Sequence, residues 1–86
     1  MEELRRDVEA VLITKYPNAR FDWDDDPLLS RLSGYVISDQ FRNQPQLARQ
    51  LELGDYLRTQ LRERATGLGL IFAYTPEEWA EKLAAA

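Results

Sequence analysis

The sequence contains neither cysteine nor histidine. Without cysteine the chain has no disulfide, no thiol nucleophile and no thiolate ligand for a metal. Without histidine it lacks the commonest metal-binding side chain and the commonest general base near neutral pH. An enzyme built on this chain would depend on carboxylate, lysine or tyrosine chemistry, and no spacing in the sequence pairs such a nucleophile with a base. We therefore predict that the protein is not an enzyme and has no metal site or cofactor of its own.

Long apolar runs are missing as well. No stretch approaches the roughly 20 apolar residues that cross a membrane, and residues 1–6 are not followed by the apolar region of a signal peptide. We therefore expect a cytoplasmic protein with no membrane contact. A chain of 86 residues predicts one domain over residues 1–86, close to the lower size limit for a single hydrophobic core.

Lysine is scarce, since Lys15 and Lys82 are the only lysines among 11 basic residues. The positive charges are therefore mostly guanidinium groups, which favour planar, two-bond pairing. Acidic residues outnumber basic ones by 15 to 11, so the formal net charge is −4. General attraction to a phosphate backbone depends on clustered lysine and arginine, so nucleic acid is not the expected partner.

The stretch from Leu68 to Trp79 is the most informative part of the chain. The apolar residues at positions 68, 70, 72 and 74 share one face of a predicted strand, while Ile71 and Ala73 share the other. Both faces are therefore expected to be at least partly covered. Thr75 and Glu78 then have the spacing of a capping box, with proline at the first helical position between them.

Hydrophobic spacing predicts six elements in the order helix–strand–strand–helix–strand–helix. They are a helix from Glu2 to about Tyr16, strands Ala19–Trp23 and Tyr35–Ser38, a helix from Pro45 to about Arg64, a strand Leu68–Tyr74 and a helix from Glu77 to about Leu83. The first two strands are expected to be antiparallel. The third returns through a helical crossover and is expected to lie parallel to the second. The prediction is an α+β fold of two layers, in which helices cover one face of a three-stranded mixed sheet.

Two segments allow more than one interpretation. The leucines at 28, 29 and 32 are too apolar for a freely solvated loop, so some of them are expected to cover the core. In the long helix, an apolar stripe is expected to face the core, and it consists of Leu47, Leu51, Leu57 and Leu61. Gly54 in the same helix is expected to mark a kink, a break or a close contact.

An acidic cluster precedes the second strand, formed by Asp22 and the aspartates at 24–26. Carboxylate oxygens bind Ca²⁺ or Mg²⁺, but the calcium-loop pattern fails here. With Asp22 as its first position, the required glycine is Pro27 and the closing glutamate is Ser33. We therefore interpret the cluster as a solvated acidic turn that protects the sheet edge.

The long helix also carries arginines that two readings explain. Arg58 and Arg62 share a face at a spacing of four residues, with Arg49 on the same helix. They are suited to an acidic partner or a phosphate. Because Glu52, Asp55 and Glu63 are interleaved with them, internal ion pairs on an exposed face explain them without a ligand, and we favour this interpretation.

Gly67 and Gly69 flank Leu68 where the predicted helix leads into the third strand. A dinucleotide-binding glycine motif follows a strand and opens a helix, so this order is the reverse of what that motif requires. The glycines allow either a close approach between backbones or an open surface for a partner. The aromatic residues Trp23, Tyr35 and Trp79, with Tyr74, fall at strand and helix spacings that favour core positions over a contact surface.

Two segments resemble the BolA-like protein family. They are Tyr35-Val-Ile-Ser-Asp-Gln-Phe41, at the end of the second strand, and Leu70-Ile-Phe-Ala-Tyr-Thr-Pro-Glu-Glu-Trp79. The resemblance implies an αββαβα fold like that of the type II KH domain. It also implies iron–sulfur or redox-linked regulation through monothiol glutaredoxins, with a transcription-factor role in some members. The family's cluster-binding histidine before the last strand corresponds to Gly67 here, and its Arg-His pair corresponds to Arg49-Gln50.

We therefore predict a non-enzymatic interaction domain that binds a protein, with a monothiol glutaredoxin as the named candidate, without supplying a His or Cys ligand. The predicted partner-binding residues are Arg49, Arg58, Arg62, Gly67 and Gly69. One alternative is a KH-like module that binds nucleic acid through arginines 42, 49, 58 and 62. Another is a self-associating structural module, and the expected state is a monomer or a weak homodimer.

Overall fold

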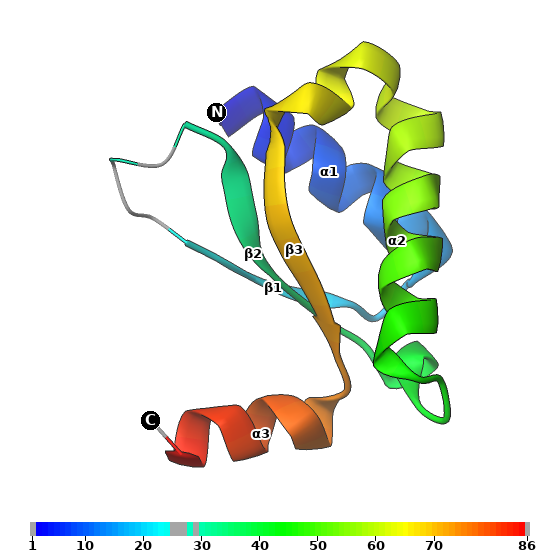
Figure 1. The fold of residues 1–86 in the computed structure, drawn as a ribbon, viewed down its shortest axis with the longest axis vertical. Helices are drawn as coiled ribbons and strands as arrows, with labels where there is room; N and C mark the ends of the chain where they lie inside the picture. The colour runs from blue at the N-terminus through cyan, green and yellow to red at the C-terminus, as the bar shows by residue number, and fades with distance from the viewer. Residues whose placement is uncertain (1, 25–27, 29, 86) are drawn as a thin grey trace.

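The computed structural model describes residues 2–24, 28 and 30–85. Its elements are α1 (Glu2–Lys15), β1 (Arg20–Trp23), β2 (Leu32–Ile37), η1 (Asp39–Phe41), α2 (Gln46–Leu61), η2 (Arg62–Gly67), β3 (Leu68–Tyr74) and α3 (Pro76–Ala85), where η marks a 3₁₀ helix (Figure 1). The sheet order is β1-β2-β3, with β1 antiparallel and β3 parallel to β2. The predicted α+β fold, its element order and its three-stranded mixed sheet are confirmed.

The core lies between one face of the sheet and the helices α1 and α2 (Figure 1). Alternate residues of β2 and β3 point to this face, as strand geometry requires. Its fully buried members include Val8 and Leu12 of α1, Val36 of β2, Leu53 of α2 and Ala73 of β3. Ile71 and Ala73 therefore share a face as predicted, and this face packs on the helices. Leu68 was expected on the other face but also packs against this core, because the register of β3 shifts between Leu68 and Ile71.

The opposite face of the sheet carries an aromatic cluster and is partly covered by α3. The ring of Tyr35 in β2 lies 5.9 Å from Phe72, 5.5 Å from Tyr74 and 5.0 Å from Trp79 of α3, centroid to centroid. All four side chains are half-buried. The tryptophan of α3 packs against this second face, which agrees with the expectation that both faces of β3 are at least partly covered.

Strand β2 begins at Leu32, three residues before the predicted start at Tyr35. The predicted strand began after Gly34 because the dipeptide Ser33-Gly34 is typical of a turn. In the structure Gly34 pairs with Trp23, and a Cβ on Gly34 would lie 2.8 Å from the Trp23 Cα. Of the leucines expected to cover the core, Leu32 is buried, Leu28 is 90% exposed, and position 29 lies outside the described residues, as do Asp25 and Asp26.

Helix α2 presents a different face to the core from the one predicted. Leu47 and Leu51 are 70% and 56% exposed. The buried residues are Arg49, Leu53, Leu57 and Leu61. The stripe prediction is therefore wrong in its first half, because Arg49 occupies a buried position and its ion-pair partner lies on another helix.

Gly54 neither kinks nor breaks α2, which continues to Leu61. A Cβ at this position would lie 3.2 Å from Nη1 of Arg58, so the glycine leaves room for a guanidinium group along the helix. Of the three predicted alternatives for Gly54, a kink, a break or a close contact, the close contact is therefore the one that the structure has. The helix ends three residues earlier than predicted, at the point where the backbone of Arg62 adopts a positive φ of 56°.

The capping box at the start of α3 is confirmed. The backbone N–H of Glu78 donates to Oγ1 of Thr75 at 3.2 Å, and the N–H of Thr75 donates to Oε1 of Glu78 at 2.8 Å. This reciprocal pair fixes the turn between β3 and α3. Across the residues that the structure describes, none of the helices has the length and apolar content to span a membrane.

Candidate functional site

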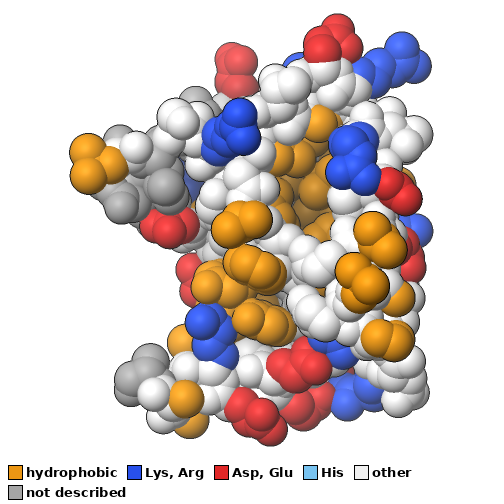
Figure 2. Space-filling model, viewed as in Figure 1, with side chains coloured by type: hydrophobic (Ala, Val, Ile, Leu, Met, Phe, Trp, Pro, Cys, Tyr) orange, Lys and Arg blue, Asp and Glu red, His pale blue; other side chains and the backbone are white. Residues whose placement is uncertain are grey.

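A groove of about 500 Å³ lies between α2 and the first half of β3. Its lining residues are Gln50, Leu53, Gly54, Leu57, Arg58, Arg62, Ala65, Thr66, Leu68, Gly69, Leu70 and Ile71. Figure 2 shows this hollow with hydrophobic side chains inside it and basic side chains on both of its flanks. A concave apolar surface with a few polar groups is the usual form of a binding site.

The floor of the groove is apolar because it opens onto the hydrophobic core. Leu53 and Leu57 from α2 meet Ile71 from β3, and all three are buried. Leu70 stands at the rim and is 69% exposed. An apolar side chain that entered the groove would therefore extend the existing core, and burying a leucine-sized group contributes about 1.5–3 kcal/mol.

Two arginines line the groove. Arg58 forms an exposed ion pair with Asp55 one helical turn earlier. For Arg62 no hydrogen bond or ion pair of the side chain occurs within the described part of the chain. An exposed ion pair within a helix is worth only about 0.3–0.5 kcal/mol, so both guanidinium groups can turn to a carboxylate on a partner at little cost.

The backbone of Arg62 is strained. Its dihedral angles are φ 56° and ψ −128°, and its N–H bonds to the carbonyl of Arg58 to close the last turn of α2. Residues with a side chain avoid this region, and holding one there costs about 1–3 kcal/mol. Glycine would occupy the position without this cost. Strained backbone of this kind clusters at functional sites, so Arg62 is a candidate site residue.

The outer edge of β3 is only partly covered. β3 is an edge strand. The side-chain amide of Gln50 donates to the carbonyl of Ile71 and accepts from the N–H of Ala73, both at 2.8 Å. Gln50 thus bonds the strand as a neighbouring strand would. In the described chain, the α2 side chains that bond this edge reach Ile71 and Ala73, so the segment Leu68–Leu70 has no such cover.

Arg49 lies apart from the groove and is buried. Its guanidinium group bonds both carboxylate oxygens of Glu78, at 2.6 and 3.2 Å, and the carbonyl of Gln44 at 2.8 Å. The bond from Arg49 is the main cause that holds the pKa of Glu78 below its ordinary value. This arginine joins α2 to α3, and its hydrogen-bonding groups are directed inward.

The two glycines have packing reasons for their positions. A Cβ on Gly69 would collide with Oγ of Ser33, and one on Gly67 would lie 2.7 Å from Cδ2 of Leu4. Gly69 therefore lets β3 approach β2, and Gly67 lets η2 approach α1. Of the five predicted site residues, the groove brings together Arg58, Arg62 and Gly69; Arg49 and Gly67 do not line it.

Gln50 and Leu70 line this groove but were not predicted as parts of a site. Gln50 precedes the buried Leu53 by three residues, so correct phasing of α2 would have placed it toward the strand. Leu70 was counted on a partly covered face, and its exposure depends on how far α3 reaches across the sheet. Among the described residues, no cluster of three or more Asp, Glu, His or Cys side chains is arranged to hold a metal ion.

No protein-family model matches this chain, and a comparison with curated proteins finds no match. The resemblance to BolA-like proteins therefore stays a prediction, carried by the two segments quoted above and by an element order that agrees with it.

Proposed function

We propose that the protein is a non-enzymatic interaction domain that binds another protein through the groove between α2 and β3. The observation that carries this proposal is the groove itself, an opening onto the core flanked by Arg58 and Arg62. A partner gains apolar burial at the floor and charge-assisted hydrogen bonds at the flank. The named candidate for the partner, from the BolA-like resemblance, is a monothiol glutaredoxin.

The exposed leucines around the groove support a protein rather than a small molecule as the ligand. Leu70 stands at its rim, while Leu47 and Leu51 stand on the outer face of α2. Exposed apolar side chains gathered beside a cleft are typical of protein interaction surfaces. Figure 2 shows hydrophobic side chains on both sides of the hollow.

The proposed role in iron–sulfur or redox-linked regulation requires the partner to hold the cluster. Iron–sulfur clusters are bound by cysteine thiolates, with histidine as the usual replacement. The chain has neither residue, and Gly67 stands where the resemblance places the family's histidine. The residues of the groove therefore do not fit a cluster, and the proposed contribution of this chain is a binding surface.

The nucleic-acid alternative is less well supported. Of its four proposed arginines, Arg42 pairs with Asp39 and Glu77, Arg49 with Glu78 and Arg58 with Asp55. Arg62 alone among these four has no such pair in the described chain. Binding to a phosphate backbone requires several free charges on one face. Absence of DNA or RNA binding at low salt would remove this alternative.

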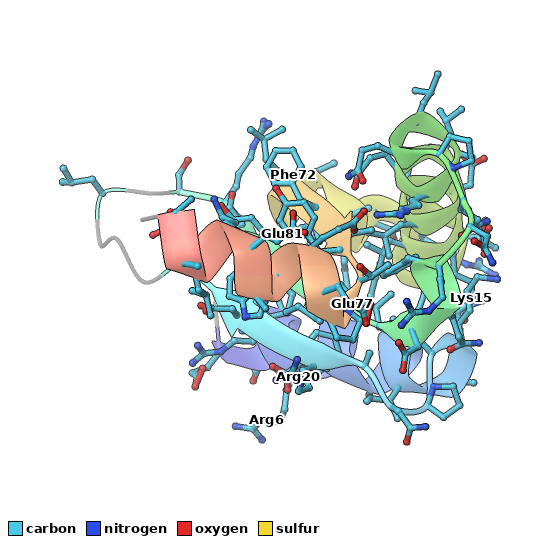
Figure 3. The ribbon with its side chains drawn as sticks, turned by 90° about the horizontal axis from the view of Figure 1, so that it is seen from below. Arg6, Lys15, Arg20, Phe72, Glu77 and Glu81 are labelled. Carbon is cyan, nitrogen blue, oxygen red and sulfur yellow. The ribbon has the colours of Figure 1, made fainter. Side chains whose placement is uncertain are left out.

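The test is an NMR titration of the isotope-labelled chain with a monothiol glutaredoxin, with and without its cluster. We expect amide shifts at Arg62, at Leu68–Ile71 and in the second half of α2. A variant with Arg58→Glu and Arg62→Glu is expected to lose the shifts. Arg6→Glu is the matched control, because Arg6 is an exposed residue of α1 that does not line the groove. It extends on the side of the molecule opposite Phe72 of β3 (Figure 3).

Two results would count against the proposal. Shifts confined to the far side, around Arg6 and Arg20, would place the binding surface elsewhere. No shifts with either form of the glutaredoxin would remove the named partner. A concentration-dependent dimer in sedimentation, whose interface shifts map to the groove, would instead identify a second copy of the chain as its occupant.

A further inference from the structure

We propose that the groove receives an extended segment of the partner, which adds to the open part of the β3 edge and presents a carboxylate to Arg62 and Arg58. This inference rests on the proposed function, since it assigns the chemistry of the segment that enters the same groove. It goes further in specifying the conformation of the segment and its charge.

The side chain of Gln50 bonds the outer edge of β3 only in its second half. Gln50 satisfies the carbonyl of Ile71 and the N–H of Ala73, so the second half of the edge is closed. Because the N–H and C=O of one strand residue point the same way, the N–H of Ile71 also faces outward. An extended chain is the structure that satisfies such groups in register.

Strand β3 is irregular beside the groove. The pairing register shifts between Leu32 and Gly34 of β2, which face Leu68 and Ile71 of β3. The N–H of Leu70 bonds the hydroxyl of Ser33 at 3.2 Å in place of a regular ladder partner. Irregularities of this kind occur where a strand bends, where its side chains change direction or where its pairing ends. Gly69, which has no side chain, lies at the centre of the open part.

The charged residues that line the groove are arginines. Arg58 and Arg62 line the groove opposite β3, and Arg62 has no carboxylate of its own in the described chain. Two guanidinium groups beside an apolar floor match a segment with an apolar side chain next to Asp or Glu.

The experiment is a selection of short random peptides against the full chain, followed by NMR titration of those enriched. We expect the enriched peptides to carry Asp or Glu beside an apolar residue and to shift Arg62 and Leu68–Ile71. Replacing the peptide carboxylate by its amide is expected to weaken binding about tenfold, the effect of one charge-assisted hydrogen bond. Methylation of alternate peptide amides is expected to abolish binding, because a strand partner needs those N–H groups.

A charge reversal sharpens the test. Selection against Arg62→Glu is expected to favour peptides with Lys or Arg, whereas Arg6→Glu leaves the acidic preference unchanged. Both side chains are exposed, and an unchanged amide spectrum outside the site verifies that each variant folds. Arg58→Glu supplies a second reversal in the same groove.

The outcomes separate this inference from the proposed function. Peptides that bind the groove equally well with neutral residues, or that bind as helices, would overturn the inference while the groove remained a binding site. Enriched peptides that shift only residues outside the groove would overturn both proposals. No enrichment at all, together with groove shifts by the glutaredoxin, would overturn the extended-segment inference alone.

Discussion

Arg49 of α2 and Glu78 of α3 form a two-bond ion pair, with Nη1–Oε1 at 2.6 Å and Nη2–Oε2 at 3.2 Å. The same Oε1 of Glu78 accepts the N–H of Thr75 in the capping box. One carboxylate therefore fixes the start of α3 and attaches it to α2. The side chain of Arg49 is buried, whereas the side chain of Glu78 is nearly half exposed.

We predict that Arg49→Ala lowers the free energy of unfolding by about 2–3 kcal/mol, because it breaks a partly buried ion pair and leaves buried acceptors unpaired. Arg49→Lys is expected to recover only part of the loss, since an ammonium group cannot make the two-bond contact. Urea denaturation measures both variants, with Arg6→Ala as the exposed control. Equal stability of the Ala variant and the wild type would show that the pair contributes nothing.

We expect Glu78 to contribute to the pH dependence of stability. Its pKa is lowered in the folded chain, first by the bond from Arg49 and then by the Thr75 N–H. A lowered folded pKa stabilises the fold above the ordinary glutamate value of about 4.3, and that contribution is lost as pH falls through the lowered value. The stability difference between wild type and Glu78→Gln should therefore be largest near neutral pH and shrink in acid.

Denaturation curves from neutral to acid pH measure this difference. Glu81→Gln, at an exposed glutamate of the same helix, is the matched control. A difference between wild type and Glu78→Gln that stayed constant down to strong acid would contradict the assignment.

Gly69→Ala is expected to destabilise the fold by about 2 kcal/mol through overpacking. The added methyl group would collide with Oγ of Ser33. In a Ser33→Ala background the same substitution should cost much less, because the colliding hydroxyl is gone. A double-mutant cycle measures this coupling. If the two substitutions were additive, the close approach of β3 to β2 at this point would not explain Gly69.

Arg62→Gly is expected to separate stability from binding. Relief of the positive φ should raise the free energy of unfolding by roughly 1 kcal/mol, after the added freedom of glycine in the unfolded chain is subtracted. Loss of the guanidinium group should weaken partner binding. Thermal denaturation and titration of the same sample measure the two effects. A variant that was less stable than wild type would contradict the strain at this position.

Substitutions along α2 test which face is buried. Leu47→Gln and Leu51→Gln should each change stability by no more than about 0.5 kcal/mol, as exposed positions do. Leu53→Ala should cost about 2–5 kcal/mol, because it opens a cavity in the core. A large loss at Leu47 with a small one at Leu53 would restore the stripe predicted from spacing alone.

The start of α3 was predicted correctly, whereas the buried face of α2 was not. For α3 the information is local, since Thr75 and Glu78 stabilise the helix start within one turn. For α2 the burial of Arg49 depends on Glu78, 29 residues along the chain. An arginine in an apolar position is excluded by spacing rules unless its partner is known.

In the candidate site too, features that depend on local spacing were predicted and features that depend on tertiary contacts were not. Arg58 and Arg62 were predicted together because a four-residue spacing places two residues on one face of a helix. Both line the groove, although α2 ends before Arg62. The strained backbone of Arg62 and the bonds from Gln50 to β3 were not predicted, because both depend on where α2 meets the strand.

The sequence by itself determined the order of helices and strands, the direction of the three strands, the start of α3 and the chemistry that the chain lacks. These follow from local spacing, caps and composition. Only the tertiary structure decided which face of α2 is buried, that Gly34 lies within β2, and that a groove opens beside the β3 edge. Each of these depends on contacts between residues distant in sequence, whose energies outweigh the local preferences.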